Sequence, residues 1–346
     1  MKTKPIIGIT MGDPASIGPE IAIKALQSEE IYDICRPIVI GDYNVIKNAC
    51  HMLNLSFSVN RINHINQSEY NYGKIDVYDL NNVDLSKLKQ GEISIEAGKA
   101  AFESVAKVIE LAQAGSIDAT VTGPINKESI NRAGYHYSGH TEIYAHLTNT
   151  KKYGMLLVEN NFRVIHVSTH VSLRDACDLV KKERILDTIE LLHNACQQLG
   201  LQNPKIAVAG LNPHSSDGGL FGNEEKLEII PAVEEAKKRG YLVEGPIPAD
   251  SLFPKAIGGV YDGIVAMYHD QGHIPFKLVG FSWDNNLHKM KSVSGVNITL
   301  GLPIIRTSVD HGTAMEIAGK GIASPDAMIL AIKYAVKLSN SRKIQE

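Results

Sequence analysis

Pro5-Ile6-Ile7-Gly8-Ile9-Thr10, close to the N-terminus, is a short and almost entirely apolar run. This pattern predicts a buried strand, and the longer apolar pattern from Ile17 to Gln27 predicts the helix that follows it. Pro37 to Gly41 repeats the strand pattern, and Tyr43 to Met52 repeats the helical one. A strand, a helix and a second strand form the unit from which parallel sheets are built.

The same alternation continues to the end of the chain. Further strands are predicted at Ile75 to Leu80, Ala119 to Gly123, Arg163 to Ser168, Lys205 to Ala209 and Gly263 to Met267. Further helices are predicted at Ser94 to Ala114, Ile143 to Leu147, Glu183 to Leu199, Asn223 to Arg239 and Asp326 to Leu338. Apolar strands separated by helices predict the α/β class, with a largely parallel sheet covered on both faces.

Length and composition exclude several classes of protein. The 346 residues make two lobes the first expectation, because a domain usually has about 100 to 200 residues. Lys and Arg number 35 against 38 Asp and Glu, which argues against a nucleic-acid binder. No apolar run approaches the roughly 20 residues that span a membrane. There is no signal-peptide pattern and no CxxC pair, so we expect a cytoplasmic protein whose thiols are reduced and mostly buried: Cys35, Cys50, Cys177 and Cys196.

Polar residues cluster where the predicted strands end. Asp13 follows the first strand, and Thr122-Gly123-Pro124-Ile125-Asn126-Lys127 follows a later one. His170, His214 and His269 each follow one more. Ligands of open α/β sheets bind beyond the carboxyl ends of the strands. We therefore expect these side chains to lie on one rim.

The three histidines have two interpretations. Imidazoles from neighbouring strand ends can converge on one divalent cation and leave positions open for substrate oxygens. Three unrelated polar loop residues are the alternative, and spacing alone favours it. Asp270, beside His269, is either an ordinary loop carboxylate or a partner that fixes the tautomer of the imidazole.

Other segments carry donors suited to an anion. Ser138-Gly139-His140-Thr141-Glu142 precedes a helix and suits either a bound phosphate or a simple helix cap. Lys277, Asn297 and the stretch from Arg306 to Ala314 lie in the last third, where cations match phosphate or carboxylate oxygens. A surface ion pair is the alternative for Lys277. Asp250 is either a cap or a site carboxylate.

Several common signatures are absent. The chain has no GxGxxG after a strand, no Walker A sequence, no GxSxG and no HExxH. One tryptophan and 6% aromatic residues give no stacking platform for single-stranded nucleic acid. The residues alone indicate an α/β enzyme with a histidine-rich, metal-dependent site for a small anionic substrate.

Seven ordered motifs, covering about residues 5 to 335, carry a resemblance. They closely resemble the 4-hydroxythreonine-4-phosphate dehydrogenase (PdxA-type) family: Met11-Gly12-Asp13-Pro14-Ala15-Ser16-Ile17-Gly18-Pro19-Glu20, Thr122 to Lys127, Ser138 to Glu142, Leu211-Asn212-Pro213-His214, Tyr268-His269-Asp270-Gln271-Gly272, Gly295-Val296-Asn297-Ile298-Thr299-Leu300-Gly301 and Arg306 to Ala314.

The resemblance implies an isocitrate/isopropylmalate dehydrogenase-like fold. This fold has two α/β/α lobes with the active site in the cleft between them, and it binds NAD without the glycine fingerprint. We expect lobe one, with NAD-side elements, at residues 1–130 and 300–346. Lobe two, with metal and dimer elements, is expected at residues 131–299. The resemblance also implies a homodimer whose active site is shared across subunits, with no nucleic acid or membrane partner.

The resemblance also assigns roles to residues. His170, His214 and His269 would bind one divalent ion (Zn, Mg, Mn or Co). His140, Thr141, Lys277, Asn297 and Arg306 would hold a phosphorylated four-carbon acid. His311, Gly312, Thr313 and Ala314 resemble the adenine-side loop for NAD. Lys127, Asp250 and His140 are candidate catalytic acids or bases.

The implied reaction is an NAD-dependent oxidative decarboxylation of a 3-hydroxy acid 4-phosphate. Ser16, His273 and the long stretch from Phe281 to Ser294 depart from the vitamin B6 branch. The last two features resemble the branch that converts D-threonate or D-erythronate 4-phosphate to dihydroxyacetone phosphate and CO2. These two sugar-acid phosphates are therefore the expected substrates. Oxidation of 4-hydroxy-L-threonine 4-phosphate for pyridoxal 5'-phosphate synthesis is the alternative. A phosphate-acyl transferase-like enzyme or a non-catalytic phosphometabolite binder is the alternative of another class.

Overall fold

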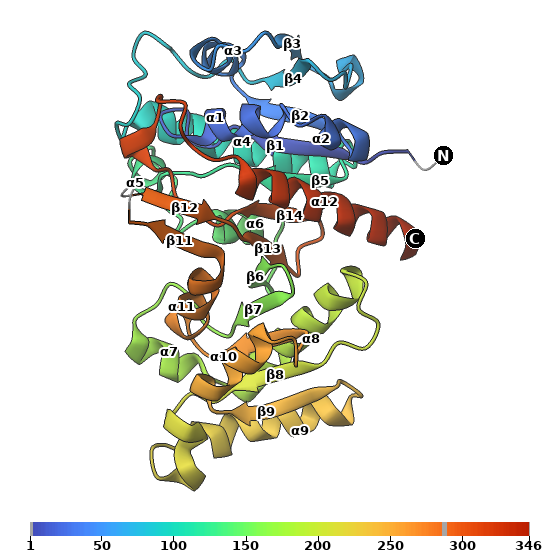
Figure 1. Ribbon diagram of the computed structural model, residues 1–346, viewed down its shortest axis with the longest axis vertical. Helices are drawn as coiled ribbons and strands as arrows, with labels where there is room; N and C mark the ends of the chain where they lie inside the picture. The colour runs from blue at the N-terminus through green and yellow to red at the C-terminus, as the bar shows by residue number, and fades with distance from the viewer. Residues whose placement is uncertain (1–2, 286–288, 346) are drawn as a thin grey trace. The chain divides into compact units, whose positions relative to one another are not determined.

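The computed structural model describes residues 3–285 and 289–345 (Figure 1). The chain divides into two compact units. Unit 1 comprises Met1–Lys151 and Leu302–Glu346, and unit 2 comprises Lys152–Gly301. No helix in the described part of the chain is long and apolar enough to cross a membrane.

The first boundary between the units differs from the expected one. Residues 131–151 were assigned to lobe two, but the structure places them in unit 1. The reason is the short helix α6 (His140–Leu147), whose fully buried Ile143 and Tyr144 belong to the same core cluster as Ile38, Ile40 and Val105. The second boundary lies within two residues of the expected position.

Unit 1 is built on six parallel strands. Their order is β3-β4-β2-β1-β5-β14. Their bounds are β1 (Ile6–Thr10), β2 (Arg36–Gly41), β3 (Ser58–Ile62), β4 (Lys74–Asp79), β5 (Ala119–Thr122) and β14 (Arg306–Val309). The predicted parallel sheet is confirmed in this unit.

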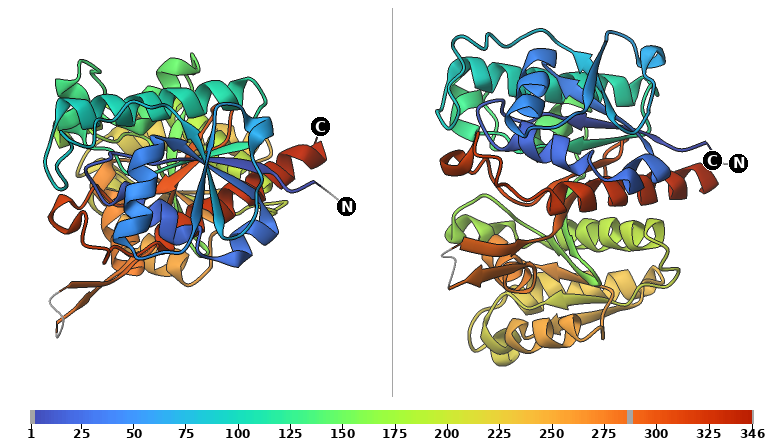
Figure 2. Two further views of the ribbon diagram at one scale, coloured as in Figure 1. Left: turned by 90° about the horizontal axis from the view of Figure 1, so that it is seen from above. Right: turned by 45° about the horizontal axis from the view of Figure 1, so that its top comes forward.

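Helices cover both faces of this sheet. They are α1 (Gly18–Ala25), α2 (Glu29–Ile34), α3 (Tyr43–Met52), α4 (Ile95–Gln113), α5 (Lys127–Arg132), α6 and α12 (Asp326–Gln345), with short 3-10 turns η1 (Ile65–Gln67) and η4 (Met315–Ile317). In the left view of Figure 2, α4 in teal lies on the opposite side of the strands from α1 in blue.

The start of α5 is fixed by local chemistry. Asn126 accepts the Ser129 backbone N–H at 2.8 Å, which caps the helix at Lys127. A Cβ at Gly98 of α4 would lie 2.1 Å from the Ser129 carbonyl oxygen, so glycine lets α5 approach α4 this closely. These contacts place Lys127 beyond the carboxyl end of β5.

Unit 2 has a mixed sheet of six strands in the order β13-β6-β7-β10-β8-β9. Strand β6 pairs antiparallel with β13 and β7, whereas β7, β10, β8 and β9 pair in parallel. The bounds are β6 (Gly154–Glu159), β7 (Phe162–His166), β8 (Ile206–Ala209), β9 (Val243–Ile247), β10 (Gly263–Ala266) and β13 (Val296–Leu300).

The helical segments of unit 2 and a hairpin complete it. They are α7 (Leu173–Leu179), α8 (Lys182–Gln198), α9 (Ile230–Lys238), α10 (Ala249–Ile257) and α11 (His269–Gly280), with a 3-10 segment η2 (Pro213–Gly219) and a π-helical segment η3 (Glu225–Ile229). Leu252 and Phe253 of α10 and Phe276 of α11 pack into the core cluster of this sheet. Strands β11 (Phe281–Asp284) and β12 (Lys289–Val293) pair antiparallel within the long stretch from Phe281 to Ser294, and residues 286–288 of that stretch lie outside the described residues.

Candidate functional site

The three predicted histidine ligands follow neighbouring strands of unit 2. Strands β7, β10 and β8 are adjacent and parallel, so their carboxyl ends meet at one edge of the sheet. His170, His214 and His269 come directly beyond β7, β8 and β10 respectively. The three histidine segments therefore share one rim of unit 2 as expected, whereas Asp13 and the stretch from Thr122 to Lys127 belong to unit 1.

The structure brings two of these imidazoles together. The ring centroids of His170 and His269 are 5.8 Å apart. Two imidazoles on one tetrahedral cation have centroids about 5 Å apart, because each metal–nitrogen bond is about 2.1 Å. Nδ1 of His269 lies 2.7 Å from Oδ1 of Asp270. An N–H donated to this carboxylate leaves the lone pair on Nε2, so the donor set fits a divalent cation.

His214 does not join this pair in the structure of the single chain. Its Nδ1 lies 3.3 Å from Oδ2 of Asp217, and its side chain is 65% exposed. Across residues 3–285 and 289–345, no three His, Cys, Asp or Glu side chains are arranged to hold a metal ion. The third ligand position of the expected site is therefore not filled from within the described chain.

The backbone is strained at both ends of this rim. His170 has φ 29° and His214 has φ 53°, in the left-handed region that non-glycine residues rarely adopt. Ser215, Ser216 and Asp217 continue the left-handed conformation after His214. Such strain costs about 1 to 3 kcal/mol per residue and is concentrated at functional sites.

Two further histidines join His269, and sequence reasoning did not select them as site residues. The His273 ring stacks on His269 with centroids 3.7 Å apart, and the His166 ring lies 4.6 Å from His273. His269 and His273 are four residues apart on α11, a spacing that places them on one helix face. This spacing is the signal that could have identified His273, whereas His166 lies within an apolar strand.

The other predicted residues of unit 2 have different surroundings. The Lys277 ammonium lies 4.1 Å from the Phe281 ring centroid. Oδ1 of Asn297 on β13 is buried and has no hydrogen-bond partner in the described part of the chain, so it can accept a bond from a ligand. Asp250 is exposed in the first turn of α10 and accepts the Ser251 backbone N–H at 2.8 Å. Asp250 is not the cap of this helix, because the N-cap position is Pro248 and no side chain caps it.

A buried cationic group lies at the sheet of unit 1. Arg306 is only 2% exposed, and its Nη2 donates to Oγ1 of Thr122 at 2.9 Å. Its guanidinium carbon lies 5.6 Å from the Tyr144 ring centroid. Burial lowers the pKa of Arg306 to about 10, which leaves it charged at neutral pH. A buried guanidinium of this kind can bind phosphate or carboxylate oxygens.

His140 lies beside this arginine at the start of α6. Burial, together with the charges of Arg306 and Lys127, holds the pKa of His140 well below 6.5, so the imidazole is neutral. Its Nε2 is buried without a hydrogen-bond partner among the described residues. Thr141 follows in the first turn of α6, partly exposed. Lys127 and Arg306 thus lie close enough to His140 in unit 1 for their charges to act on it.

Asp13, at the carboxyl end of β1, was expected at the end of the first strand, but the sequence assigned it no catalytic or binding role. Its side chain is fully buried, and burial raises its pKa to about 6. Oδ1 accepts the Ala15 backbone N–H at 2.9 Å, while Oδ2 has no partner in the described chain. The burial of a residue in a loop motif is not visible in a sequence.

The loop predicted to contact NAD packs against the start of α1. The Ile17 N–H donates to the Thr313 carbonyl at 3.2 Å, and the Gly18 N–H donates to Ser16 Oγ at 3.0 Å. These amides are thus already bonded, so they offer no dinucleotide phosphate site of the glycine-fingerprint kind. His311 and Gly312 precede Thr313, and Ala314 has a left-handed φ of 42°. The predicted loop is therefore ordered against the β1–α1 turn.

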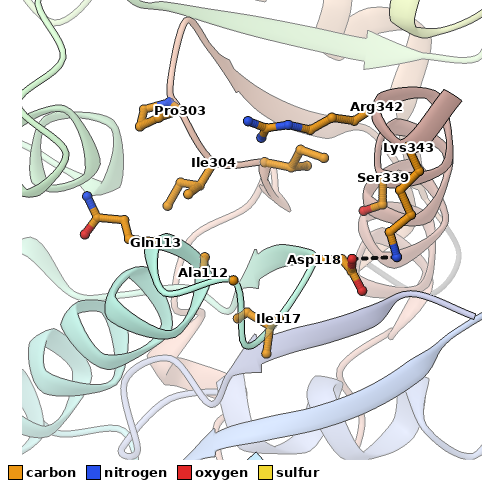
Figure 3. A pocket seen from close by; sticks show the side chains of 11 residues that line it. Ala112, Gln113, Ile117, Asp118, Pro303, Ile304, Ser339, Arg342 and Lys343 are labelled. Atoms are coloured by element: carbon orange, nitrogen blue, oxygen red, sulfur yellow. Dashed lines mark ion pairs between the residues drawn. The ribbon is translucent and has the colours of Figure 1, made fainter. Parts of the chain in front are cut away.

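A separate cavity of about 470 Å³ lies at the opposite ends of the unit 1 strands (Figure 3). Its lining includes Asp118 before β5, Ile304 before β14 and Lys343 near the end of α12. Lys343 pairs with Asp118 at 2.6 Å. Ligands of parallel sheets bind at carboxyl ends, so this amino-end cavity is not the candidate site.

Comparison with known proteins identifies the family. The sequence model described as "Pyridoxal phosphate biosynthetic protein PdxA" matches residues 33–335. The chain belongs to the PdxA family. It is 48% identical over 339 residues to a Clostridium botulinum (strain Langeland) protein named "Putative D-threonate 4-phosphate dehydrogenase", covering 98% of both chains.

Solved structures of PdxA-family members agree. A 4-hydroxythreonine-4-phosphate dehydrogenase from Burkholderia phymatum is 42% identical, with a TM-score of 0.81 and coverage of 97% of this chain and 99% of that one. The enzyme of the same name from Klebsiella pneumoniae is 38% identical, with a TM-score of 0.85 and coverage of 98% and 99%. The chain therefore has the isocitrate/isopropylmalate dehydrogenase-like fold of a family of dehydrogenases, and the expected fold class is confirmed.

Proposed function

We propose that this PdxA-family protein is an NAD-dependent, divalent-metal-assisted decarboxylating dehydrogenase. Its substrate is a four-carbon 3-hydroxy acid 4-phosphate, D-threonate 4-phosphate or D-erythronate 4-phosphate, and its products are dihydroxyacetone phosphate and CO2. The observation that carries the proposal is the pair His170 and His269, with Asp270 orienting the second imidazole. This arrangement supports a metal site, and the named members of the family are dehydrogenases.

The choice of substrate follows the names of the relatives. Curated proteins 47% and 48% identical to this chain carry the D-threonate 4-phosphate name. The solved structures, at 38% and 42% identity, carry the 4-hydroxythreonine name. Oxidation of 4-hydroxy-L-threonine 4-phosphate is therefore the second candidate function. The two substrates differ in a hydroxyl or an ammonium at C2.

The phosphate is assigned to the cationic group of unit 1. Arg306 would bind its oxygens with a guanidinium held by Thr122, and Thr141 would add a hydroxyl donor. His140, which is neutral because of its burial and its cationic neighbours, can donate to an oxygen without a change of charge. Lys127 and His140 are the candidates for moving the hydroxyl proton.

The chemistry at the carbinol is assigned to unit 2. His170 and His269 would hold the cation, and Lys277 and Asn297 would orient the acid. A divalent cation at this place makes a bound hydroxyl more acidic and stabilises the negative charge that develops during decarboxylation. NAD, against the loop from His311 to Ala314, would accept the hydride from C3.

We also propose that the site is completed in a homodimer by His214 of a second copy. His214 is exposed and apart from the other two histidines. Leu220 and Phe221, which follow it closely, are 75% and 49% exposed, and apolar surface of this kind favours burial against a partner.

Mixing inactive variants tests this sharing. H214A and H269A homodimers should each be inactive, because each lacks one ligand in every site. Re-equilibrated mixtures should regain about a quarter of wild-type activity, because half of the dimers are mixed and each has one intact site. A mixture that stays inactive would show that all three histidines must come from one copy.

The reaction itself is tested by its stoichiometry. The metal-loaded protein should form one NADH and one CO2 for each D-threonate 4-phosphate consumed. Chelation should stop both, and added Zn²⁺, Mn²⁺ or Co²⁺ should restore them. NADH without CO2 would limit the proposal to the dehydrogenation step, and substrate binding without NADH would identify a phosphometabolite binder.

A further inference from the structure

The histidine group of unit 2 contains more imidazoles than the proposed metal site needs. His166 and His273 lie against His269, yet neither is among the three proposed ligands. The centroid distances are 3.7 Å for His269–His273, 4.6 Å for His166–His273 and 6.4 Å for His166–His269. His273 therefore lies at the corner of the triangle formed by the three rings and is nearer to each of the other two than they are to one another.

His273 contacts His269 in two ways. The two rings are stacked with an interplanar angle of 11°. Nδ1 of His273 also lies 3.1 Å from the backbone carbonyl oxygen of His269, so an N–H there can donate to it. The face of the His273 imidazole thus packs on the His269 ring, and Nδ1 at its edge can bond the His269 backbone carbonyl. The backbone contact fixes the orientation of the His273 ring, and the stacked face then restricts the rotamer of His269.

His166 meets His273 from the side. The three centroid distances give an angle of about 100° at His273, so His166 lies at the edge of the ring whose face His269 covers. A Cβ at Gly272 would lie 2.3 Å from His166 Nε2, so glycine in the first turn of α11 makes room for the imidazole.

His166 occupies this place at a cost to stability. It is 1% exposed, and neither ring nitrogen has a hydrogen bond of good geometry in the part of the chain that is described, where the Met155 backbone offers only a marginal contact. Unsatisfied buried polar atoms destabilise a fold, so an apolar residue would stabilise this strand end better. The imidazole is therefore explained better by its contact with His273 than by the core.

We propose that His273 is a positioning residue that holds the His269 imidazole in its metal-binding orientation, and that His166 acts through His273 by bracing its edge. The inference rests on the proposed metal site and goes beyond it, since neither residue is a ligand. Restricting the ligand ring before the metal arrives lowers the ordering cost of binding. Groups that orient a ligand typically change metal affinity about 10- to 100-fold.

The test measures Co²⁺ binding to the full-length apoprotein, by titration of the visible absorption band against a competing chelator. No substrate or NAD is needed. H273L should bind Co²⁺ about 10-fold more weakly than wild type, with a changed band. H273F keeps a flat ring over His269 and should stay within about threefold of wild type.

H166L distinguishes positioning from a structural role. It should weaken Co²⁺ binding about threefold, while the Tm of the apoprotein stays equal or rises, because two unsatisfied nitrogens are removed. In the H273L background H166L should have no further effect on binding, because its action requires His273. H193L is the matched control. It removes a ring contact with Tyr241 at 4.7 Å elsewhere in unit 2 and should leave Co²⁺ affinity unchanged.

Equal Co²⁺ affinity and identical bands in wild type and H273L would overturn the inference and leave the proposed function standing. A fall in affinity in H166L that persists in the H273L background would overturn the part assigned to His166. A wild-type protein that binds no Co²⁺ would instead refute the metal part of the proposed function, and with it the inference.

Discussion

Replacement of Asp13 by asparagine should remove a pH-dependent cost from the folded state. The carboxyl group is fully buried, and burial raises its pKa from an ordinary 3.8 to about 6. The two values differ by about 2, and one pKa unit corresponds to 1.36 kcal/mol, so the ionised carboxylate costs about 3 kcal/mol. Asparagine keeps the carbonyl oxygen that accepts the Ala15 N–H and carries no charge.

The sign follows from linkage. Below about pH 3 the carboxyl is protonated in both the folded and the unfolded chain, so burial carries no ionic penalty. Between about pH 4 and pH 6 the unfolded chain releases its proton first, and the folded wild type loses stability relative to the variant. Above about pH 7 the penalty is complete and constant.

The assay is the free energy of unfolding by urea at pH values from 4 to 8, with a chelator present to keep the protein free of metal. The difference between D13N and wild type should rise by about 2 kcal/mol between pH 4 and pH 6 and level off above about pH 7, because the other titrating groups are common to both proteins. A difference that stays constant across this range would show that Asp13 is not held in a low-dielectric environment and would refute the reasoning.

Three other substitutions test the site. H214A should abolish turnover while leaving the Tm of the apoprotein unchanged, because this side chain is exposed; turnover near the wild-type level would remove His214 from the ligand set. D270N should weaken metal affinity about 10- to 100-fold by losing the carboxylate that orients His269, and chelator competition that finds equal affinity would refute this role. R306K should raise KM for the phosphorylated acid about 10-fold or more, because an ammonium cannot replace the guanidinium fork; kinetics with unchanged KM would place the phosphate elsewhere.

The α/β architecture was predictable because apolar runs mark buried strands. The predicted strand from Pro5 to Thr10 and the predicted helix from Tyr43 to Met52 match β1 and α3 closely. The antiparallel pairing of β6 with β13 was not predicted, since alternation with helices implies parallel strands. Helix α11 was missed because Gly272, Pro275 and Gly280 lower its helical propensity.

The candidate site was predictable only in part, because a sequence pattern places residues along the chain and does not show which loops meet. Placing His170 and His269 after predicted strands located their shared rim, because parallel strands end together. That the His214 imidazole does not join those of His170 and His269 could not be deduced, because spacing does not show which loops converge. His166 could not be found either, since an apolar run does not reveal which of its residues meets another ring.

The most direct test of the proposed function compares NADH formation by the metal-loaded protein with three substrates: D-threonate 4-phosphate, D-erythronate 4-phosphate and 4-hydroxy-L-threonine 4-phosphate. A site that hydrogen-bonds one C2 substituent should discriminate against the other. NADH should form with D-threonate 4-phosphate or D-erythronate 4-phosphate, and little or none should form with 4-hydroxy-L-threonine 4-phosphate. NADH formation with 4-hydroxy-L-threonine 4-phosphate alone would contradict the proposed substrate and assign the protein to pyridoxal phosphate synthesis.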